Sequence, residues 1–175
     1  MNAIESFDEW GDAQLERLRG HPVADPIFKA ASTLGDFSGI WQLISVGRLI
    51  TGRTSSRQSL AFSALIGAES LVVNQGVKRL FGRIRPTESG DPRFPVRRPS
   101  TSSFPSGHAS AAFFSAAILT AATGKRFAPV WYSTAAVVAV SRAYVRIHHP
   151  SDVVAGAAVG VALGTIGSRI FKAIA

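Results

Sequence analysis

Cysteine is absent from the 175-residue sequence, which excludes both a disulfide framework and a thiolate metal site. Acidic residues are scarce: 11 Asp and Glu stand against 19 Lys and Arg, which gives a formal net charge of +8. A divalent metal ion prefers carboxylate ligands and is repelled by such an excess of cations. We therefore expect chemistry without a metal or another cofactor.

The N-terminal residues do not resemble a signal peptide, because Glu5, Asp8, Glu9 and Asp12 lie where a basic and then an apolar region would be. Residues 1–24 instead mix acids with apolar side chains, a pattern typical of an amphipathic helix at a membrane interface. A solvated helix fits the same pattern equally well. Insertion into a membrane would then depend on internal spans.

The composition indicates such spans, because 46% of the residues are hydrophobic although the chain is strongly basic. Soluble domains rarely combine these two properties. Residues 26–50 are mostly apolar but interrupted by Gly and Asp, which predicts either one broken span or two short helices. Four more apolar runs come near the roughly 20 residues that cross a bilayer. These runs are Leu60–Phe81, Ala109–Ala122, Ala128–Ile147 and Val153–Ile170.

The expected fold class is therefore all-α: a single domain over residues 1–175, forming an integral-membrane helical bundle of about five to six spans in the plasma (inner) membrane. Glycines recur every four residues in the last run, at Gly156, Gly160 and Gly164. Such a stripe lets another helix approach closely. Its partner is either a helix of the same chain or a second copy in a homodimer.

The one long polar segment, residues 82–105, contains five prolines and five arginines. A loop of this length in a compact protein is usually functional or disordered, and the motifs beside it favour an active-site loop. The span from Lys78 to Arg98 carries seven of the 19 Lys and Arg. Basic clusters between apolar runs favour lipid head groups or phosphate as partners, rather than nucleic acid.

The first motif pairs Lys78 with Arg85, seven residues or about two helical turns later. Pro86 disfavours helical geometry at Arg85, so the helix is predicted to end before it. Asn74 lies one turn before Lys78 on the same face and is a candidate supporting residue. Taken alone, two such cations also fit ordinary anchors at a membrane surface.

The second motif is Ser106-Gly107-His108, directly before an apolar run. Ser106 suits an N-cap, and Gly107 allows a ligand to approach the backbone. Free amides together with the helix dipole then form an anion site. The alternative is a simple capped helix with a bystander histidine.

The third motif contains Arg142, His148 and Asp152. A carboxylate near one imidazole nitrogen orients the ring and leaves the other nitrogen able to attack. Asp152 could equally act only as a helix cap. If the spans alternate in direction, all three motifs reach the same membrane face, where their cations and histidines suit in-line phosphoryl transfer.

With these three motifs, the sequence resembles the type 2 phosphatidic acid phosphatase family. The family pattern is Lys, six residues, Arg-Pro; then Pro-Ser-Gly-His; then Ser-Arg, five residues, His, three residues, Asp, and it is complete between residues 78 and 152. The resemblance implies that His148 attacks phosphorus to form a phosphohistidine, that Asp152 orients it, and that His108 protonates the leaving oxygen. The implied phosphoryl-binding residues are Lys78, Arg85, Ser106, Gly107 and Arg142.

The resemblance also implies a lipid-linked phosphate substrate: phosphatidate, phosphatidylglycerol phosphate or a polyprenyl-linked compound. The short chain and its Ala, Arg and Gly content are most similar to bacterial polyprenyl-linked members of cell-wall synthesis, such as those acting on decaprenylphosphoryl 5-phosphoribose. Two rivals remain open: a vanadium haloperoxidase, and a non-enzymatic lipid-binding membrane scaffold. The membrane side that the site faces also remains open.

Residues outside the motifs receive weaker predictions. Glu69 is expected to face a neighbouring helix rather than the site, and His149 to be a neighbour of the nucleophile without its role. Five further arginines could gather an anionic head group, although a solvated basic surface is the expected role of most of them. They are Arg83, Arg93, Arg97, Arg98 and Arg146.

Overall fold

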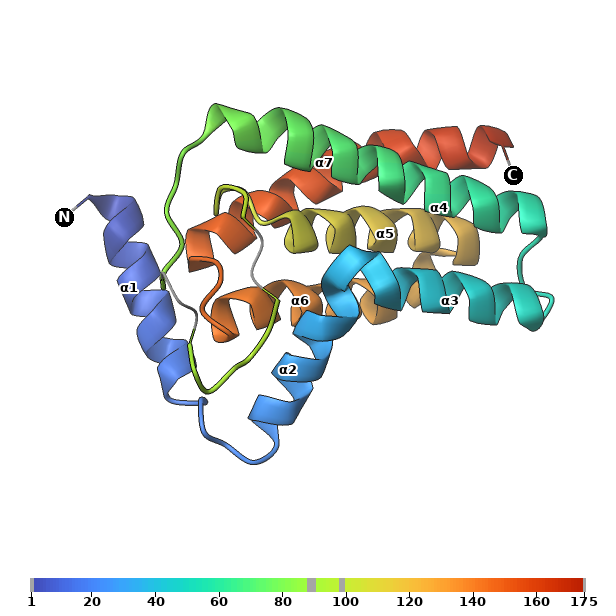
Figure 1. Cartoon of the computed structure of the whole chain (residues 1–175). Coiled ribbons are helices and arrows are strands. Elements are labelled where there is room, and N and C mark those ends of the chain that lie inside the picture. The colour runs from blue at the N-terminus through green and yellow to red at the C-terminus, as the bar shows by residue number, and fades with distance from the viewer. Residues whose placement is uncertain (1, 88–90, 98–99, 175) are drawn as a thin grey trace.

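The computed structural model describes residues 2–87, 91–97 and 100–174, and these residues form seven α-helices and no strand (Figure 1). The helices are α1 (Ala3–Glu16), α2 (Ala24–Gly35), α3 (Gly39–Ile50), α4 (Ser56–Leu71), α5 (Gly107–Thr123), α6 (Ala128–Tyr144) and α7 (Pro150–Ile174). The predicted all-α class is confirmed.

Helix α5 lies at the centre of the bundle, in contact with α4, α6 and α7 (Figure 1). Helix α2 packs on α6, and α3 runs beside α4. The core between them is built from large apolar side chains, among them Trp41, Phe62, Phe114 and Ile118, all nearly or fully buried. Because α5 carries mostly Ala and Ser between these large residues, its neighbours can pack close to it.

The glycine stripe of α7 faces α5 within the same chain. A Cβ at Gly156 would lie 2.3 Å from the Ser106 carbonyl oxygen, and one at Gly160 would lie 2.2 Å from that of Ser110. Gly164 is also buried, with the Ala117 Cβ 2.7 Å from where its own would be. Between the two partners predicted for this stripe, the fold selects the intramolecular one. Helix α5 covers these glycines in the single chain, and a homodimer stays a prediction.

Residues 26–50 form two helices rather than one broken span. Helices α2 and α3 have 12 residues each, and the chain turns sharply between them. Phe37 and Ser38 have left-handed φ angles of 53° and 58° there. Non-glycine residues pay a steric cost in this region, and such positions tend to cluster at functional sites.

Two helical segments are long and apolar enough to cross a membrane: Ser56–Leu80, which continues α4 through two short turns, and Pro150–Ile174. Each has 25 residues. Helices α5 and α6 are shorter, with 17 residues each. A count of five to six spans therefore stays a prediction.

Helix boundaries differ from the predicted runs where local chemistry decides them. Ser55 caps α4 through a reciprocal capping box, so the helix starts at Ser56 rather than at Leu60. Helix α6 ends at Tyr144, before the predicted Ile147, and the turn after it has Arg146 at a φ of 58°.

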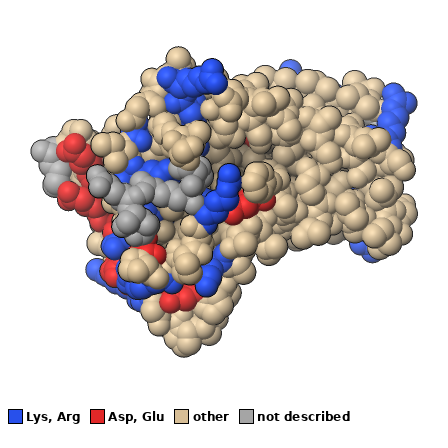
Figure 2. All heavy atoms as spheres, in the orientation of Figure 1, with Lys and Arg blue, Asp and Glu red and all other residues tan. Residues whose placement is uncertain are grey.

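Charged residues gather at the end of the molecule where α1 lies, whereas the face shown along the helices is mostly uncharged (Figure 2). Many large apolar side chains remain exposed, including Leu43, Leu60 and Ile166 at 56–71%. Exposed apolar surface of this extent marks an interaction surface in a soluble protein and suits contact with lipid here.

Helix α1 pairs two of its acids, Asp12 and Glu16, with arginines that follow it in the chain. Asp12 pairs with Arg19 at 2.6 Å and with Arg146 at 2.8 Å, and Glu16 pairs with Arg93 at 2.9 Å. Arg146 is thus paired with the acids of α1, whereas Arg93 remains exposed at the surface, as predicted for most of these arginines, although it pairs with Glu16.

The apolar side of α1 points outward instead. Ile4 and Trp10 are 59% and 60% exposed, and Phe7 is 40% exposed. Such a stripe is typical of a helix lying at a membrane interface. The interfacial role of residues 1–24 stays a prediction.

Candidate active site

The three sequence motifs meet at one end of the bundle, as the predicted alternation of helix directions requires. The end of the Ser56–Leu80 segment, the start of α5 and the turn between α6 and α7 come together there. They enclose a cavity of about 390 Å³ whose lining includes Asn74, Lys78, Gly107, His108 and His148. Both motif histidines therefore face the same space.

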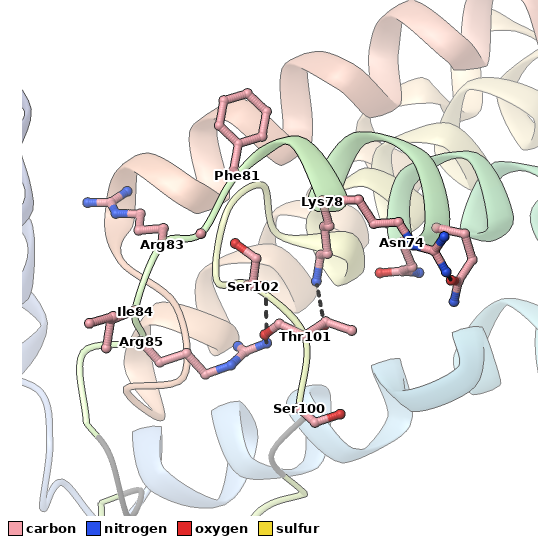
Figure 3. A pocket seen from close by; sticks show the side chains of 12 residues that line it. Asn74, Lys78, Phe81, Arg83, Ile84, Arg85, Ser100, Thr101 and Ser102 are labelled. Carbon is pink, nitrogen blue, oxygen red and sulfur yellow. Dashed lines mark hydrogen bonds between the residues drawn. The ribbon is translucent and has the colours of Figure 1, made fainter.

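Lys78 is placed by an irregular helix end. The chain forms a π-helical turn at Val72–Gly76 and a 3₁₀ turn at Val77–Leu80, and then becomes extended at Phe81. π-helical turns are rare and frequently mark functional sites. The buried Lys78 side chain points toward Thr101, with Nζ 3.5 Å from its Oγ1 (Figure 3).

Arg85 follows on the extended segment, because the helix ends before Pro86 as predicted. Its Nη1 donates to the Ile147 carbonyl at 2.6 Å, and its Nη2 donates to the Thr101 carbonyl at 2.9 Å. The same Nη1 lies 3.3 Å from His148 Nε2. The guanidinium is thus held directly beside the imidazole.

The start of α5 is built to receive an anion. Ser106 is the N-cap, accepting a hydrogen bond from the Ala109 amide at 3.4 Å. A Cβ at Gly107 would lie 2.8 Å from Asn74 Oδ1, so Asn74 packs closely on this turn, and its predicted support of Lys78 stays a prediction. The first amides of α5 and its dipole favour negative charge at this end.

Arg142 is fully buried below this turn. Its Nη1 donates to the Ser32 carbonyl at 3.0 Å and to the Ser32 hydroxyl at 2.5 Å. Its Nε and Nη2 are buried and have no hydrogen-bond partner among the described residues. Buried unsatisfied donors are costly in general, which makes this guanidinium a strong candidate for binding phosphoryl oxygens.

His148 is 2% exposed, and its Nδ1 lies 3.5 Å from Asp152 Oδ2. This distance is long for a hydrogen bond, and Nδ1 has no hydrogen-bond partner among the described residues. The carboxylate thus faces Nδ1, while Nε2 on the other side of the ring faces Arg85. Burial, together with the cations Arg85 and Lys78, lowers the pKa of His148 to about 3 and outweighs the opposing effect of Asp152. The imidazole is therefore neutral at neutral pH, as a nucleophile must be.

This lowered pKa predicts that His148 stays neutral from pH 8 down to pH 5. An ordinary histidine, with a pKa of about 6.5, would become charged across that range. In a pH titration of histidine side-chain NMR signals, the signal lost in His148→Gln should not shift above pH 5. A midpoint near 6.5 would contradict the burial and charge argument.

Asp152 is fixed by several donors besides its contact with His148. The Ser103 hydroxyl donates to Oδ2, the His149 amide donates to Oδ2 at 2.8 Å, and Arg83 Nη1 donates to Oδ1 at 2.6 Å. The carboxylate therefore binds backbone at the start of α7 and also faces the imidazole. The contact that a helix cap makes and the approach to the imidazole are both present, and the orienting role of Asp152 stays a prediction.

Arg83 also bonds to a residue far away in α1. Its Nη2 donates to Asp8 Oδ2 at 2.5 Å, and the same carboxylate accepts from the Ser151 amide at 2.7 Å. Asp8 is buried. The prediction of a solvated surface role for Arg83 is wrong, because it bridges α1 to Asp152.

Asp8→Asn is expected to lower kcat about tenfold with little change in KM, because the loss of one buried charged hydrogen bond is typically worth 1–3 kcal/mol. The change loosens Arg83 and Ser151, which hold Asp152, without touching the cavity. Steady-state rates of phosphate release measure kcat and KM of this variant. Glu9→Gln, an exposed neighbour on α1, is the control, and identical kinetics for the two variants would refute the bridge.

Asp36 is a second residue that sequence reasoning missed. It lies at the turn between α2 and α3, and its Oδ1 is 2.9 Å from His108 Nε2 and 3.8 Å from Arg142 Nη1. A lone carboxylate inside an apolar run was the available signal, since ionisable groups near a membrane are costly and usually functional. From the sequence, Asp36 indicates only an interruption of the run, as one broken span or as two short helices.

Asp36→Asn is expected to lower kcat about tenfold, because the amide cannot stabilise a positively charged imidazole at His108 as a carboxylate does. KM should not rise, since removing a negative charge near Arg142 eases the binding of an anion. Initial rates over a range of substrate concentrations separate the two parameters. An unchanged kcat would show that Asp36 has no part in positioning His108.

The remaining sequence predictions have mixed outcomes. Glu69 faces α5, as expected, where it accepts a hydrogen bond from the Ser110 hydroxyl. His149 Nε2 lies 3.2 Å from the Ile84 carbonyl, outside the lining of the cavity of about 390 Å³. Arg97 lines that cavity and lies over the Phe37 ring at 4.6 Å. Arg98 and residues 88–90 of the predicted active-site loop lie outside the described residues.

Comparison with protein families matches residues 59–174 to the PAP2 superfamily. A lipid A 1-phosphatase of Porphyromonas gingivalis is 32% identical over 121 residues, which are 66% of this chain and 25% of that protein. A decaprenylphosphoryl-5-phosphoribose phosphatase of Mycolicibacterium smegmatis is 31% identical over 142 residues, covering 79% of this chain and 74% of that protein. The chain thus spans only about a quarter of the first relative.

Solved structures share the fold. A transmembrane PAP2-type phosphatidylglycerolphosphate phosphatase from Bacillus subtilis superposes with a TM-score of 0.75 at 23% identity, covering 100% of this chain and 89% of that one. LpxE from Aquifex aeolicus superposes with a TM-score of 0.73 at 22% identity, and the match covers 97% of this chain and 96% of that one. A bacterial vanadium-dependent iodoperoxidase superposes with a TM-score of 0.61 at 14% identity, and the match covers 94% of this chain and 47% of that one.

Proposed function

The chain belongs to the PAP2 superfamily, and on this basis we propose that it is a membrane phosphatase that hydrolyses a phosphomonoester or diphosphate on a lipid-linked substrate. The reaction needs no metal ion and passes through a phosphohistidine at His148. The enzyme is a multi-pass protein of the plasma (inner) membrane.

One observation carries this proposal: a buried, neutral His148 with Arg85 at 3.3 Å on one side and Asp152 at 3.5 Å on the other. A neutral imidazole oriented by a carboxylate is an activated nucleophile, and the adjacent cation stabilises the negative charge of the phosphoryl oxygens. No such arrangement is needed by a lipid-binding scaffold, since burying these groups without a function is costly.

Two steps follow from the arrangement. His148 Nε2 attacks phosphorus and forms a P–N bond while the bond from phosphorus to the leaving oxygen breaks, and His108 gives that oxygen a proton. Water then attacks phosphorus, its proton passes to His108, and the P–N bond breaks to release phosphate. Lys78, Arg142 and the Gly107 turn hold the equatorial oxygens in both steps.

The proposed substrate is polyprenyl-linked, with decaprenylphosphoryl 5-phosphoribose as the first candidate. The relative named for that substrate is 31% identical and matched over most of its length, which supports this choice. Phosphatidate and phosphatidylglycerol phosphate are the alternatives, and the fold is shared with a phosphatase named for the latter. Exposed apolar surface along the helices suits a substrate with long lipid chains.

Phosphate release in detergent from a panel of these lipid phosphates, with and without EDTA, tests the proposal. We expect turnover that EDTA does not change, fastest with the polyprenyl-linked substrate. Loss of activity with EDTA would refute the metal-independent reaction. Absence of phosphate release from every lipid would refute the phosphatase itself.

A further inference from the structure

A second cavity lies beside the catalytic one and is larger, at about 750 Å³. It is lined by the end of the Ser56–Leu80 segment, by the extended residues 81–85 and by residues 100–102, which form its opposite wall (Figure 3). Asn74, Lys78 and Thr101 line both cavities. The larger cavity, here called the outer lobe, therefore adjoins the catalytic cavity at Lys78.

The polar groups of the outer lobe suit an anion. Gln75, Arg79 and the hydroxyls of Ser100 and Ser102 line it together with Lys78, and none of its described lining residues is an Asp or Glu. Arg79 Nη2 donates to Gln75 Oε1 at 2.7 Å, which orients the exposed guanidinium. An oriented arginine beside hydroxyl donors binds a phosphate oxygen pair well.

Arg83 contributes little to this charge. In Figure 3 its side chain points away from Lys78, and its guanidinium is paired with Asp8 and Asp152. Arg79 has no carboxylate partner among the described residues. The neighbouring residue, Lys78, lines both cavities. Lys78 and Arg85 also line the outer lobe, but both belong to the proposed catalytic site, so Arg79 is the cation that can serve a second anion there.

The outer lobe is not the place of the transferred phosphoryl group, because His108 and His148 line the other cavity. We propose that the outer lobe binds a second anionic group of the substrate head group. The preferred substrate then carries a phosphodiester in addition to the phosphomonoester that is removed. This inference rests on the proposed function and narrows its substrate class.

Binding of soluble head-group analogues to the full chain in neutral detergent tests the inference by calorimetry. The first probe is the deacylated head group of phosphatidylglycerol phosphate, in which CH₂ replaces the terminal ester oxygen to prevent hydrolysis. The second is the corresponding glycerol phosphonate, which lacks the phosphodiester. We expect the first to bind about tenfold more tightly, since charged hydrogen bonds to one more anionic group are worth that factor.

Arg79→Gln should remove most of this tenfold difference and leave the Kd of the glycerol phosphonate within about twofold of wild type. Arg57→Gln, an exposed arginine at the other end of the same helical segment, should behave as wild type. Equal Kd values of the two probes for wild type would overturn the inference. An equal loss for both probes in Arg79→Gln would also overturn it, because it would show general attraction to anions such as the bilayer surface.

Activity separates this inference from the proposed function. Wild type should have a higher kcat/KM for phosphatidylglycerol phosphate than for phosphatidate, and Arg79→Gln should reduce that preference through KM rather than kcat. A reversed or absent preference in an active wild type would overturn the inference. If wild type released no phosphate from either lipid, the proposed function would fail, and the calorimetric comparison would still decide whether the outer lobe binds a second anion.

Discussion

His148→Ala should lower phosphate release by at least about 10³-fold, because removal of a nucleophile eliminates the covalent step and leaves only the binding contribution to rate. The imidazole is enclosed, neutral and held beside Arg85, and no other described nitrogen of this kind shares those three properties. Initial rates with the best lipid phosphate of the panel measure the loss. Substrate binding should change much less than kcat.

His149→Ala is the matched control for this loss. The two histidines are adjacent in sequence, but His149 is only half-buried and lies beside the Ile84 carbonyl instead of the phosphoryl-binding residues. Its variant should keep at least about half of the wild-type rate, as is usual for substitutions away from a site. Equal losses in the two variants would show that the α6–α7 turn, rather than His148 itself, is required.

Trapping the intermediate gives an independent readout. Substrate with a radiolabelled phosphoryl group, quenched in alkali after a few milliseconds, should leave label on wild type and none on His148→Ala. A labelled His148→Ala protein would assign the nucleophile to another residue.

Much of the site could be predicted from the sequence because its motifs obey local rules. Pro86 disfavours helix at Arg85, which does lie beyond the helical segment that ends at Leu80, and Ser106 caps α5. Membrane spans that alternate in direction then bring the motifs to one end. The residues at the helix ends and the lengths of the apolar runs are therefore sufficient to predict that the motifs meet.

Asp8 and Asp36 could not be predicted in the same way. Asp8 meets Arg83 across 75 residues of sequence, and Asp36 meets His108 across 72. No periodicity or motif relates such pairs, because they depend on where α1 and the α2–α3 turn dock against the bundle. Asp36 reaches His108 directly, whereas Asp8 reaches Asp152 only through Arg83, so the missing information concerned the support of the site rather than its reacting groups.

The glycine stripe of α7 also separates what the sequence predicts from what tertiary packing decides. Spacing alone predicted a close helix contact and left the partner open, since a stripe of small residues fits either a neighbouring helix or a second copy. The partner was decided by packing: the backbone of α5 occupies the space where the Cβ atoms would be. One consequence is that the stripe also fixes the position of the phosphate-binding turn.

Gly156→Ala should therefore impair both stability and catalysis. Its Cβ would lie 2.3 Å from the Ser106 carbonyl oxygen and 3.1 Å from the Ala109 Cβ, and backbone cannot move aside as a flexible side chain can. Overpacking of this kind typically costs about 1–3 kcal/mol. Separating α7 from α5 also strains the 2.9 Å hydrogen bond from the Ser106 amide to the Asp152 carbonyl, which joins the proposed phosphate-binding turn to the proposed positioning residue of His148.

Two further alanine variants separate these effects. Gly47→Ala on α3, with no atom within 4 Å of its Cβ, should be neutral or slightly stabilising, because alanine favours helix. Gly160→Ala meets the Ser110 carbonyl at 2.2 Å, one turn farther from the site. It should lower the thermal midpoint as much as Gly156→Ala does, while activity per folded molecule falls about tenfold only for Gly156→Ala. Equal specific activities in the two variants would mean that the α5–α7 contact supports the fold but does not position Ser106, and the phosphate-binding turn would then owe its geometry to Asn74 and Asp152 alone.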